Sequence, residues 1–475
     1  MGELKEKTLS GVKWNAIGRF STQGISFIIS VLLARVLTPS DYGVVGMIGI
    51  FMAIANTFIG SGFGSALIRK QDCTDADYST AFYFNIVVGI VCYLILFLSA
   101  PLIAAFFDTP ILKDVVRVLS INLFLGSLSI VQNARLTKAV DFKSQAKVSL
   151  IATIVSGTIG LTMAYNGFGV WSLVSQQVAS SLMTTILLWI ITKWRPQRVF
   201  SKLSFEYLFG FGSKILSASL LHTIYCHLTT ILIGKFYTPQ ALGYYSRGES
   251  LATLPSSNLT GILQSVTYPI LSKIQDDDAR LIQVYRKYIQ MTSMVVFFGM
   301  LLLAALAKPF IITLLTDKWA ESIIFLQVFC FALMFDHLNL LNLNILYVKG
   351  RSDLVLRLEV IKKIIAIFMI IASLPFGVLA ICISRALYNQ IAVVINTYYT
   401  GKFFGLGYVA QVKDFIKYLL CSGLAALPAF WLTYTSLSPM LVLILGAVLA
   451  CAIYWVLLRK DENLKEVFVL LKKRK

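Results

Sequence analysis

Long apolar runs alternate with short polar segments along the whole chain. Runs near 20 residues match the thickness of the hydrocarbon core of a bilayer, so each predicts a transmembrane helix. The predicted helices occupy residues 12–36, 41–67, 77–101, 112–135, 145–166, 168–192, 208–235, 240–270, 285–307, 321–347, 355–374, 376–400, 412–434 and 438–458. The pattern therefore predicts an all-α integral membrane protein with about fourteen transmembrane helices. No cleavage site follows the first run, so we expect an uncleaved first helix.

Two neighbouring helix pairs are separated only by tight turns. An Asn166-Gly167 turn follows the run at 145–166, and a turn at Pro375–Gly377 follows the run at 355–374. Glycine and proline at these positions break a helix and reverse the chain. Each pair is therefore predicted to form a helical hairpin.

The positions of the Lys and Arg residues support an even number of helices. When the N-terminal side is called inside, 33 of the 42 Lys and Arg residues fall in inside segments, 6 in outside segments and 3 within helices. Basic residues accumulate on the cytoplasmic side of membrane proteins. We therefore expect both termini in the cytoplasm, and thirteen or fifteen helices would disrupt the alternation.

Two short motifs recur in the same order in the two halves of the chain. Thr38-Pro39 of the segment 38–43 returns as Thr238-Pro239 of 238–243, and Phe-Gly-Val at 168–170 returns at 376–378. Both halves begin inside and contain six helices, so they are predicted to be parallel repeats. The predicted divisions are an N-terminal lobe at 1–200, a C-terminal lobe at 201–402, and two further helices with a basic cytoplasmic tail at 403–475.

Composition agrees with a membrane protein and excludes most soluble classes. The 475 residues are 57% hydrophobic and only 14% charged, with a mean hydropathy of +0.77, whereas soluble domains carry about 25% charged residues. The net charge of +19 is spread over short clusters between apolar runs, so we expect no nucleic-acid partner. The seven cysteines include no CxxC pair and no Cys/His spacing for a metal, and we expect neither a metal nor a cofactor.

Three arginines lie within predicted helices: Arg19, Arg247 and Arg385. A charge that faces lipid is costly, so each is expected to face the interior of the helix bundle. As cations in a wet cavity they would bind an anionic cargo. Alternatively, Arg19 would reach the cytoplasmic headgroups, and Arg247 would form a structural pair with a carboxylate on another helix.

Other polar residues within helices are candidates for ion coupling or for lining a polar cavity: Glu249, Asp336 and His337. Arg247 and Glu249 are two residues apart and do not share a helical face, so at least one needs another partner. Asp336 and His337 interrupt an apolar run that continues with asparagines. They would form either a proton or cation site or interhelical hydrogen bonds.

Motifs for catalysis are missing from the sequence. There is no phosphate-binding loop of the Walker A type and no nucleophile constellation, and we do not expect an enzyme. The Asp276–Asp278 run resembles the Asp-x-Asp element of nucleotide-sugar glycosyltransferases. We interpret it as a solvated charge run in a loop of about fifteen residues, because no folded domain surrounds it.

The segment Leu32–Gly43 resembles the opening signature of bacterial polysaccharide exporters, the Wzx-type flippases of the multidrug/oligosaccharidyl-lipid/polysaccharide superfamily. The motif at Arg135–Lys138, with Asp141-Phe142, is similar to colanic-acid and lipopolysaccharide exporters. The helix count, the two halves and the basic inside segments also agree with this resemblance, which covers nearly the whole chain.

The resemblance implies a central cavity between two lobes and transport by alternating access. The implied cargo is an undecaprenyl-diphosphate-linked oligosaccharide, flipped across the bacterial cytoplasmic membrane for polysaccharide biosynthesis and driven by an H⁺ or Na⁺ gradient. Relatives carry cavity arginines on helices 1 and 8, and Arg19 and Arg247 match them by helix position only. We expect a monomer. The alternatives are a multidrug or cation antiporter of the same superfamily and a polytopic glycosyltransferase or polymerase.

Overall fold

The structure is a computed structural model that describes residues 2–60 and 62–466. Within these residues the regular structure is helical and no strand is present. The chain divides into two compact units, Met1–Gly243 and Tyr244–Lys475. The all-α membrane fold predicted from the sequence is confirmed, whereas the division into lobes at 200 and 402 stays a prediction.

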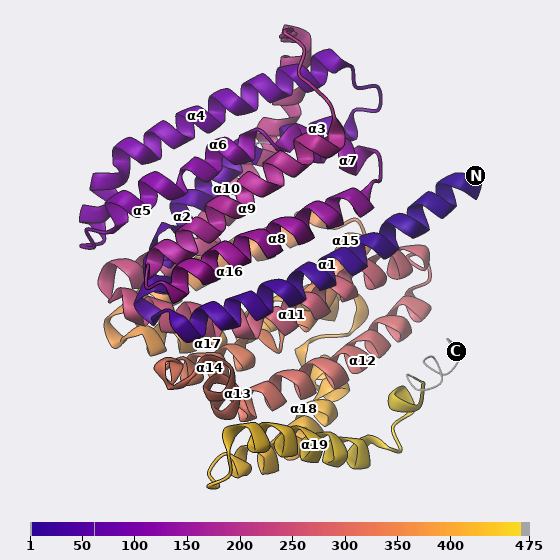
Figure 1. The fold of residues 1–475 in the computed structure, drawn as a ribbon. Coiled ribbons are helices and arrows are strands. Elements are labelled where there is room, and N and C mark those ends of the chain that lie inside the picture. The colour runs from indigo at the N-terminus through magenta and orange to yellow at the C-terminus, as the bar shows by residue number, and fades with distance from the viewer. Residues whose placement is uncertain (1, 61, 467–475) are drawn as a thin grey trace. The chain divides into compact units, whose positions relative to one another are not determined.

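The first unit contains ten complete helices and the first turn of an eleventh (Figure 1). They are α1 (Gly2–Val36), α2 (Pro39–Gly60), α3 (Phe63–Arg69), α4 (Asp75–Phe106), α5 (Leu112–Leu119), α6 (Ile121–Ser127), α7 (Ile130–Lys138), α8 (Phe142–Tyr165), α9 (Val170–Thr192), α10 (Lys202–Phe236) and the start of α11 (Pro239–Lys273).

The second unit contains the rest of α11 and the helices that follow it. They are α12 (Asp278–Ala305), α13 (Ala307–Leu315), α14 (Ser322–Leu333), α15 (Asp336–Val348), α16 (Ser352–Ser373), α17 (Val378–Phe404), α18 (Tyr408–Leu432) and α19 (Pro439–Leu458), with short 3-10 turns at Asp317–Trp319 and Leu374–Phe376.

Each predicted span coincides with a helix or with a broken helical segment. Within the described residues, 11 helices are long and apolar enough to cross a membrane. The count is 12 if the bent pair Leu112–Ser127 and Ile130–Lys138 forms one span. The remaining two, α11 and α16, have the length but carry charged side chains. The count of fourteen is consistent with the structure and stays a prediction.

Some predicted boundaries were wrong. Helix α12 begins at Asp278 rather than at 285, because Asp277 caps its first turn by accepting a hydrogen bond from the Arg280 backbone N–H at 3.0 Å. The Asp276–Asp278 run is therefore not part of a fifteen-residue loop. It ends a short turn and begins a helix.

Three predicted spans correspond to more than one helix: 41–67 covers α2 and α3, 112–135 covers α5, α6 and α7, and 321–347 covers α14 and α15. Between α6 and α7, the hydroxyls of Ser127 and Ser129 donate to the carbonyls of Phe124 and Gly126, which competes with the regular helical pattern. Between α14 and α15, the backbone is interrupted just before Asp336. Hydropathy alone does not reveal such breaks, because the apolar pattern continues across them.

Both predicted hairpins are present. Helices α8 and α9 pack against each other, as do α16 and α17 (Figure 1). The first turn places Gly167 at φ 81° and Gly169 at φ 53°, and the second places Gly377 at φ 97°. Residues with side chains rarely adopt these values, which explains the glycines of both turns.

The two copies of the Thr-Pro motif contact each other at the starts of α2 and α11. A Cβ atom on Gly43 would lie 1.7 Å from the carbonyl oxygen of Pro239, and a Cβ atom on Gly243 would lie 1.9 Å from that of Pro39. Only glycine permits this reciprocal approach of two backbones. The motif that marks the repeat in the sequence is thus also a packing contact in the first unit.

Replacement of Gly43 by Ala is expected to destabilise the protein. The added methyl group meets a backbone oxygen that cannot rotate away, and overpacking of this kind costs about 1–3 kcal/mol. Gly49→Ala in the same helix is the matched control, because nothing lies within 4 Å of the added atom. In thermal unfolding of the purified protein, Gly43→Ala should lower the Tm and Gly49→Ala should not. Equal Tm values would contradict the contact.

Candidate functional site

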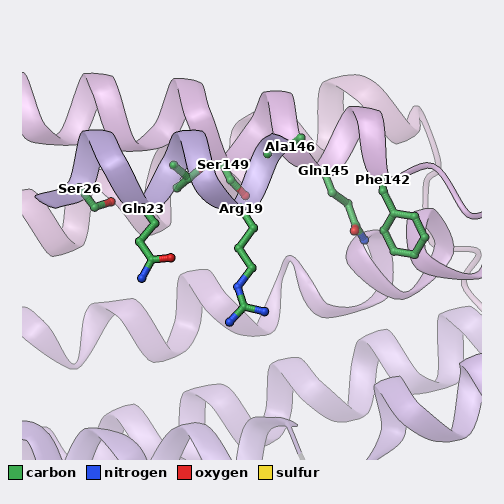
Figure 2. Close-up of a pocket in the computed structure, with 9 residues that line it drawn as sticks. Arg19, Gln23, Ser26, Phe142, Gln145, Ala146 and Ser149 are labelled. Atoms are coloured by element: carbon green, nitrogen blue, oxygen red, sulfur yellow. The ribbon is translucent and has the colours of Figure 1, made fainter. Parts of the chain in front are cut away.

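A pocket of about 510 Å³ lies between α1 and α8 in the first unit (Figure 2). Six of its nine lining residues have polar side chains, and the lining consists of Gly18, Arg19, Thr22, Gln23, Ser26, Phe142, Gln145, Ala146 and Ser149. The two helices approach closely through small residues, because a Cβ on Gly18 would lie 2.4 Å from the Cβ of Ala146. This close contact holds the polar side chains of both helices around one space.

Arg19 is exposed and projects from the same side of α1 as Gln23, one turn later (Figure 2). The large apolar side chains of Ile17 and Ile28, 44% and 58% exposed, lie roughly 180–200° around the helix from Arg19. Helix α1 thus has a lipid-compatible face and an opposite polar face. No carboxylate within the described residues forms an ion pair with Arg19, so its charge is open to an anion.

Gln145 forms part of the floor of this pocket and is held firmly in place. Its side-chain amide donates to Asn133 Oδ1 at 2.9 Å and to Thr137 Oγ1 at 2.8 Å, which fixes α8 to α7. Sequence reasoning missed Gln145 and Ser149. The signal for both was the recurrence of polar residues in the first turns of an otherwise apolar helix.

Arg385 and Glu249, both predicted site residues, come together in the second unit. The Nη1 atom of Arg385 on α17 donates to a carboxylate oxygen of Glu249 on α11 and, at 3.1 Å, to the hydroxyl of the buried Tyr245. Its guanidinium carbon also lies 5.2 Å from the ring centroid of Phe329. Sequence reasoning expected at least one of Arg247 and Glu249 to have another partner, and for Glu249 that partner is Arg385.

Arg247 is in a different environment from Arg19. Its side chain is buried, 5% exposed, and its guanidinium carbon lies 5.8 Å from the ring centroid of the buried Trp319. The contact with an aromatic face gives the charge a partner within the protein. This geometry favours a structural role, and the assignment of Arg247 as a cavity cation stays a prediction.

Asp336 and His337 make hydrogen bonds between helices. Asn389 of α17 donates to Asp336 at 3.3 Å and to the Ala332 carbonyl at 2.9 Å, next to the break between α14 and α15. The fully buried His337 Nε2 lies 2.9 Å from the hydroxyl of Ser293 on α12. Of the two uses predicted for these residues, the contacts favour interhelical hydrogen bonding.

Two polar clusters hold the second unit together. Sequence reasoning missed Arg286, Asp414 and Gln411, whereas Asn342 is one of the asparagines that follow Asp336-His337, where interhelical hydrogen bonds were one of the two predicted uses. Arg286 of α12 binds Asp414 of α18 through Nε and Nη2, at 2.7–3.1 Å. The buried side-chain amides of Asn342 and Gln411 exchange two hydrogen bonds at 2.9 Å. The residues of each pair are far apart in the chain, so no local pattern predicts that they are partners. Within the described part of the chain, no group of three His, Cys, Asp or Glu residues is placed to hold a metal ion.

Residues 32–324 match the family model described as "Polysaccharide biosynthesis protein". The chain belongs to this polysaccharide biosynthesis protein family. The match spans more than half of the sequence and includes the signature at Leu32–Gly43, so the resemblance to polysaccharide exporters is confirmed.

Curated relatives with similar sequences have names from polysaccharide biosynthesis. The chain is 26% identical to the teichuronic acid biosynthesis protein TuaB of Bacillus subtilis, over 74% of each chain. It is 23% identical to the lipopolysaccharide biosynthesis protein WzxC of Escherichia coli, over 83% of this chain and 80% of the relative. It is also 24% identical to the succinoglycan biosynthesis transport protein ExoT of Rhizobium meliloti, over 67% and 65%.

Solved structures share the fold of this family member. The lipid II flippase MurJ in an inward closed conformation aligns with a TM-score of 0.76 at 14% identity, over 94% of this chain and 99% of MurJ. An inward-facing multidrug resistance transporter of the MATE family aligns with a TM-score of 0.60 at 14% identity, over 82% and 96%. The chain therefore shares the fold of these two transporters.

The pocket beside Arg19 is expected to be wet and attractive to anions. In a variant whose seven native cysteines are replaced, a cysteine at Gln23 should react quickly with small water-soluble thiol reagents. An anionic reagent should react faster than a cationic one. Arg19→Gln should lower the ratio of the anionic to the cationic reaction rate about fivefold, because a unit charge one helical turn away acts oppositely on the two reagents.

A cysteine at the lipid-facing Ile28 is the matched control for this labelling experiment, because it should react slowly with both reagents. The rates are measured by mass spectrometry of the labelled protein. Equal reaction rates at positions 23 and 28 would contradict the pocket as described. So would a ratio of anionic to cationic reaction rates that stays the same in Arg19→Gln.

Proposed function

We propose that this protein is a transporter that flips a lipid-linked oligosaccharide across the cytoplasmic membrane for polysaccharide biosynthesis. The cargo is an undecaprenyl-diphosphate-linked sugar chain, and the transport uses alternating access. The single observation that carries the proposal is the exposed Arg19 in a polar pocket within a membrane helix.

The chemistry of the pocket suits a lipid diphosphate. Arg19 is the third residue of the apolar span Ile17–Val36, so it lies near one end of the span, where a lipid diphosphate headgroup can reach it. The planar guanidinium of Arg19 offers paired N–H donors that match phosphate oxygens. The hydroxyl and amide side chains of Thr22, Gln23, Ser26 and Ser149 can bind sugar hydroxyls. The lipid tail would remain in the bilayer.

The names of the relatives agree with this proposal. TuaB, WzxC and ExoT are each named for the biosynthesis or transport of a bacterial polysaccharide, and MurJ is named a lipid II flippase. A flippase would supply lipid-linked units to the reactions that assemble the polymer. On this basis the protein is a transporter rather than an enzyme.

The runner-up, a multidrug or cation antiporter, would need an acidic cavity. Within the described residues, the lining of the α1–α8 pocket contains a cation and no carboxylate. Glu249 and Asp336 are already engaged by Arg385 and Asn389. These contacts favour the flippase. A glycosyltransferase or polymerase is less well supported, because the Asp276–Asp278 run serves to start α12.

Transport by the reconstituted protein tests the proposal directly. Vesicles would contain a polyprenyl-diphosphate disaccharide with a fluorescent label, and loss of label to a membrane-impermeant quencher reports flipping. Wild type should flip the lipid faster than empty vesicles. Arg19→Gln should slow flipping about tenfold, because a hydrogen bond to a charged group is worth about 1.5–3 kcal/mol.

Two variants serve as controls in the transport assay. Arg19→Lys keeps the charge and should retain part of the activity, whereas Ile28→Ala on the lipid face should leave activity unchanged. Wild-type transport no faster than that of empty vesicles would refute the flippase. Normal transport by Arg19→Gln would remove Arg19 from the site.

The location, topology and coupling of the transporter are also proposed. Both termini lie in the cytoplasm, the membrane is the bacterial inner membrane, the protein acts as a monomer, and an H⁺ or Na⁺ gradient drives transport. The 33-to-6 distribution of Lys and Arg supports the orientation.

Reporter fusions test this orientation. Alkaline phosphatase, which is active only outside the cytoplasm, should be inactive when fused after Lys475 and active when fused in the turn at Ser436 between α18 and α19. The reverse pattern would overturn the assigned topology.

A further inference from the structure

The ion pair between Arg385 and Glu249 leaves half of the guanidinium unused. Both hydrogen bonds of Arg385 come from Nη1, one to Glu249 and one to Tyr245. Within the described residues, its Nε and Nη2 atoms make no hydrogen bond. An arginine has five N–H donors, and the Nε–Nη2 edge is the one that takes two oxygens of a carboxylate or phosphate side by side.

A second ion pair in the same unit uses the Nε–Nη2 edge of its arginine, although that arginine, Arg286, is itself 48% exposed. Arg286 contacts Asp414 through both Nε and Nη2 at 2.7–3.1 Å, and Gln290 adds a hydrogen bond to the same carboxylate at 3.1 Å. Asp414 is only 2% exposed. This pair is a structural clamp between α12 and α18. The Arg385–Glu249 pair is singly bonded and about one-third exposed on each side, at 32% and 27%.

Arg385 lies on the face of α17 opposite to the exposed apolar side chains of that helix. The exposed apolar side chains of α17 recur on one face, at Leu379, Ile383, Leu387 and Ile391. Arg385 lies roughly 200° around the helix from Ile383 and from Leu387, on the opposite face. Asn389, one turn later, shares the polar face with Arg385 and contacts Asp336. The remaining exposure of the guanidinium is therefore on the polar side of α17.

We propose that Glu249 is an exchangeable counter-ion that occupies Arg385 until a diphosphate group replaces it. This inference deepens the proposed flippase and rests on it for the identity of the cargo. Arg19 is an open cation, whereas Arg385 is a covered one. When an anion arrives, the Nε–Nη2 edge binds two phosphate oxygens, and the negative charge of the phosphate displaces Glu249 from Nη1.

The exchange has a clear physical basis. A carboxylate held by one nitrogen makes fewer charge-assisted contacts than a more highly charged phosphate held by a guanidinium edge, so the paired contact with phosphate can replace it. Tyr245 remains bonded to Nη1 and keeps the guanidinium oriented during the exchange. Glu249 thereby covers Arg385 in the empty protein and lowers its affinity for weaker anions.

Binding of geranylgeranyl diphosphate to the purified full-length protein in nanodiscs tests this proposal. Isothermal titration gives the Kd for each variant, with inorganic diphosphate as a parallel probe that separates lipid diphosphates from free anions. Glu249→Gln should tighten binding about fivefold, because no ion pair must be broken. Binding no tighter than that of wild type would overturn the proposal.

A double-mutant cycle shows whether Glu249 acts through Arg385. In the Arg385→Gln background, Glu249→Gln should leave the Kd unchanged. If Glu249→Gln still lowers the Kd in this background, Glu249 acts by general electrostatics and the proposal is refuted.

Arg385→Lys keeps the test decisive if Arg385→Gln does not fold. Lysine preserves the charge and the contact with Glu249 but lacks the second edge, so binding should weaken about tenfold. Binding equal to wild type would exclude the Nε–Nη2 edge as the phosphate site.

Asp414→Asn is the matched structural control. Loss of the Arg286 clamp should lower the Tm and leave the Kd unchanged. The transport assay separates the two hypotheses. If the wild type fails to flip the labelled lipid but Glu249→Gln binds the diphosphate more tightly, the flippase is refuted and the exchange is retained. If the wild type flips the lipid but Glu249→Gln binds no more tightly, the exchange is refuted and the flippase is retained.

Discussion

The cost of placing a charge within a membrane is the constraint on which the rest of this structure depends. Each arginine within a helix needs water or a partner. Arg19 faces a polar pocket, Arg247 lies on the ring of Trp319, and Arg385 is paired with Glu249. The same problem is solved in three ways, and only the first leaves the charge without a partner within the described residues. The differences between the three sites suggest different functions for residues that look alike in the sequence.

Close packing of helices makes these solutions possible. The bilayer offers no hydrogen bonds to the backbone, so helices associate through small residues and a few polar contacts. Gly18 against Ala146 brings α1 and α8 together beside the pocket, and Gly43 against Pro239 joins the two copies of the repeated motif. In the second unit, the Arg286–Asp414 and Asn342–Gln411 contacts fix helices from distant parts of the chain. Rigid helices of this kind hold a charged side chain at a defined depth.

A transporter for an anionic lipid needs cations that bind and then release their cargo. A fully used ion pair would bind too firmly to exchange, whereas an uncovered cation would retain any anion. The singly bonded Arg385 lies between these extremes, whereas Arg19 is an open cation. Membership of the polysaccharide biosynthesis protein family and the fold shared with MurJ give this arrangement a biological setting. The sugars of the cargo would be bound by neutral polar groups, which form weaker and more exchangeable contacts.

The sequence by itself determined the membrane class, the positions of the helices, both hairpins and the family signature at Leu32–Gly43. These features depend on local hydropathy, on turn residues such as Gly167 and Gly377, and on a contiguous motif. It also identified Arg19, Glu249 and Arg385 as polar exceptions within apolar runs. Only the tertiary structure decided that Arg385 pairs with Glu249, that Arg247 packs on Trp319, and that Gln145 and Ser149 complete a pocket. Such partners come from helices far apart in the chain, and hydropathy records how deep a side chain lies but not which helix it faces.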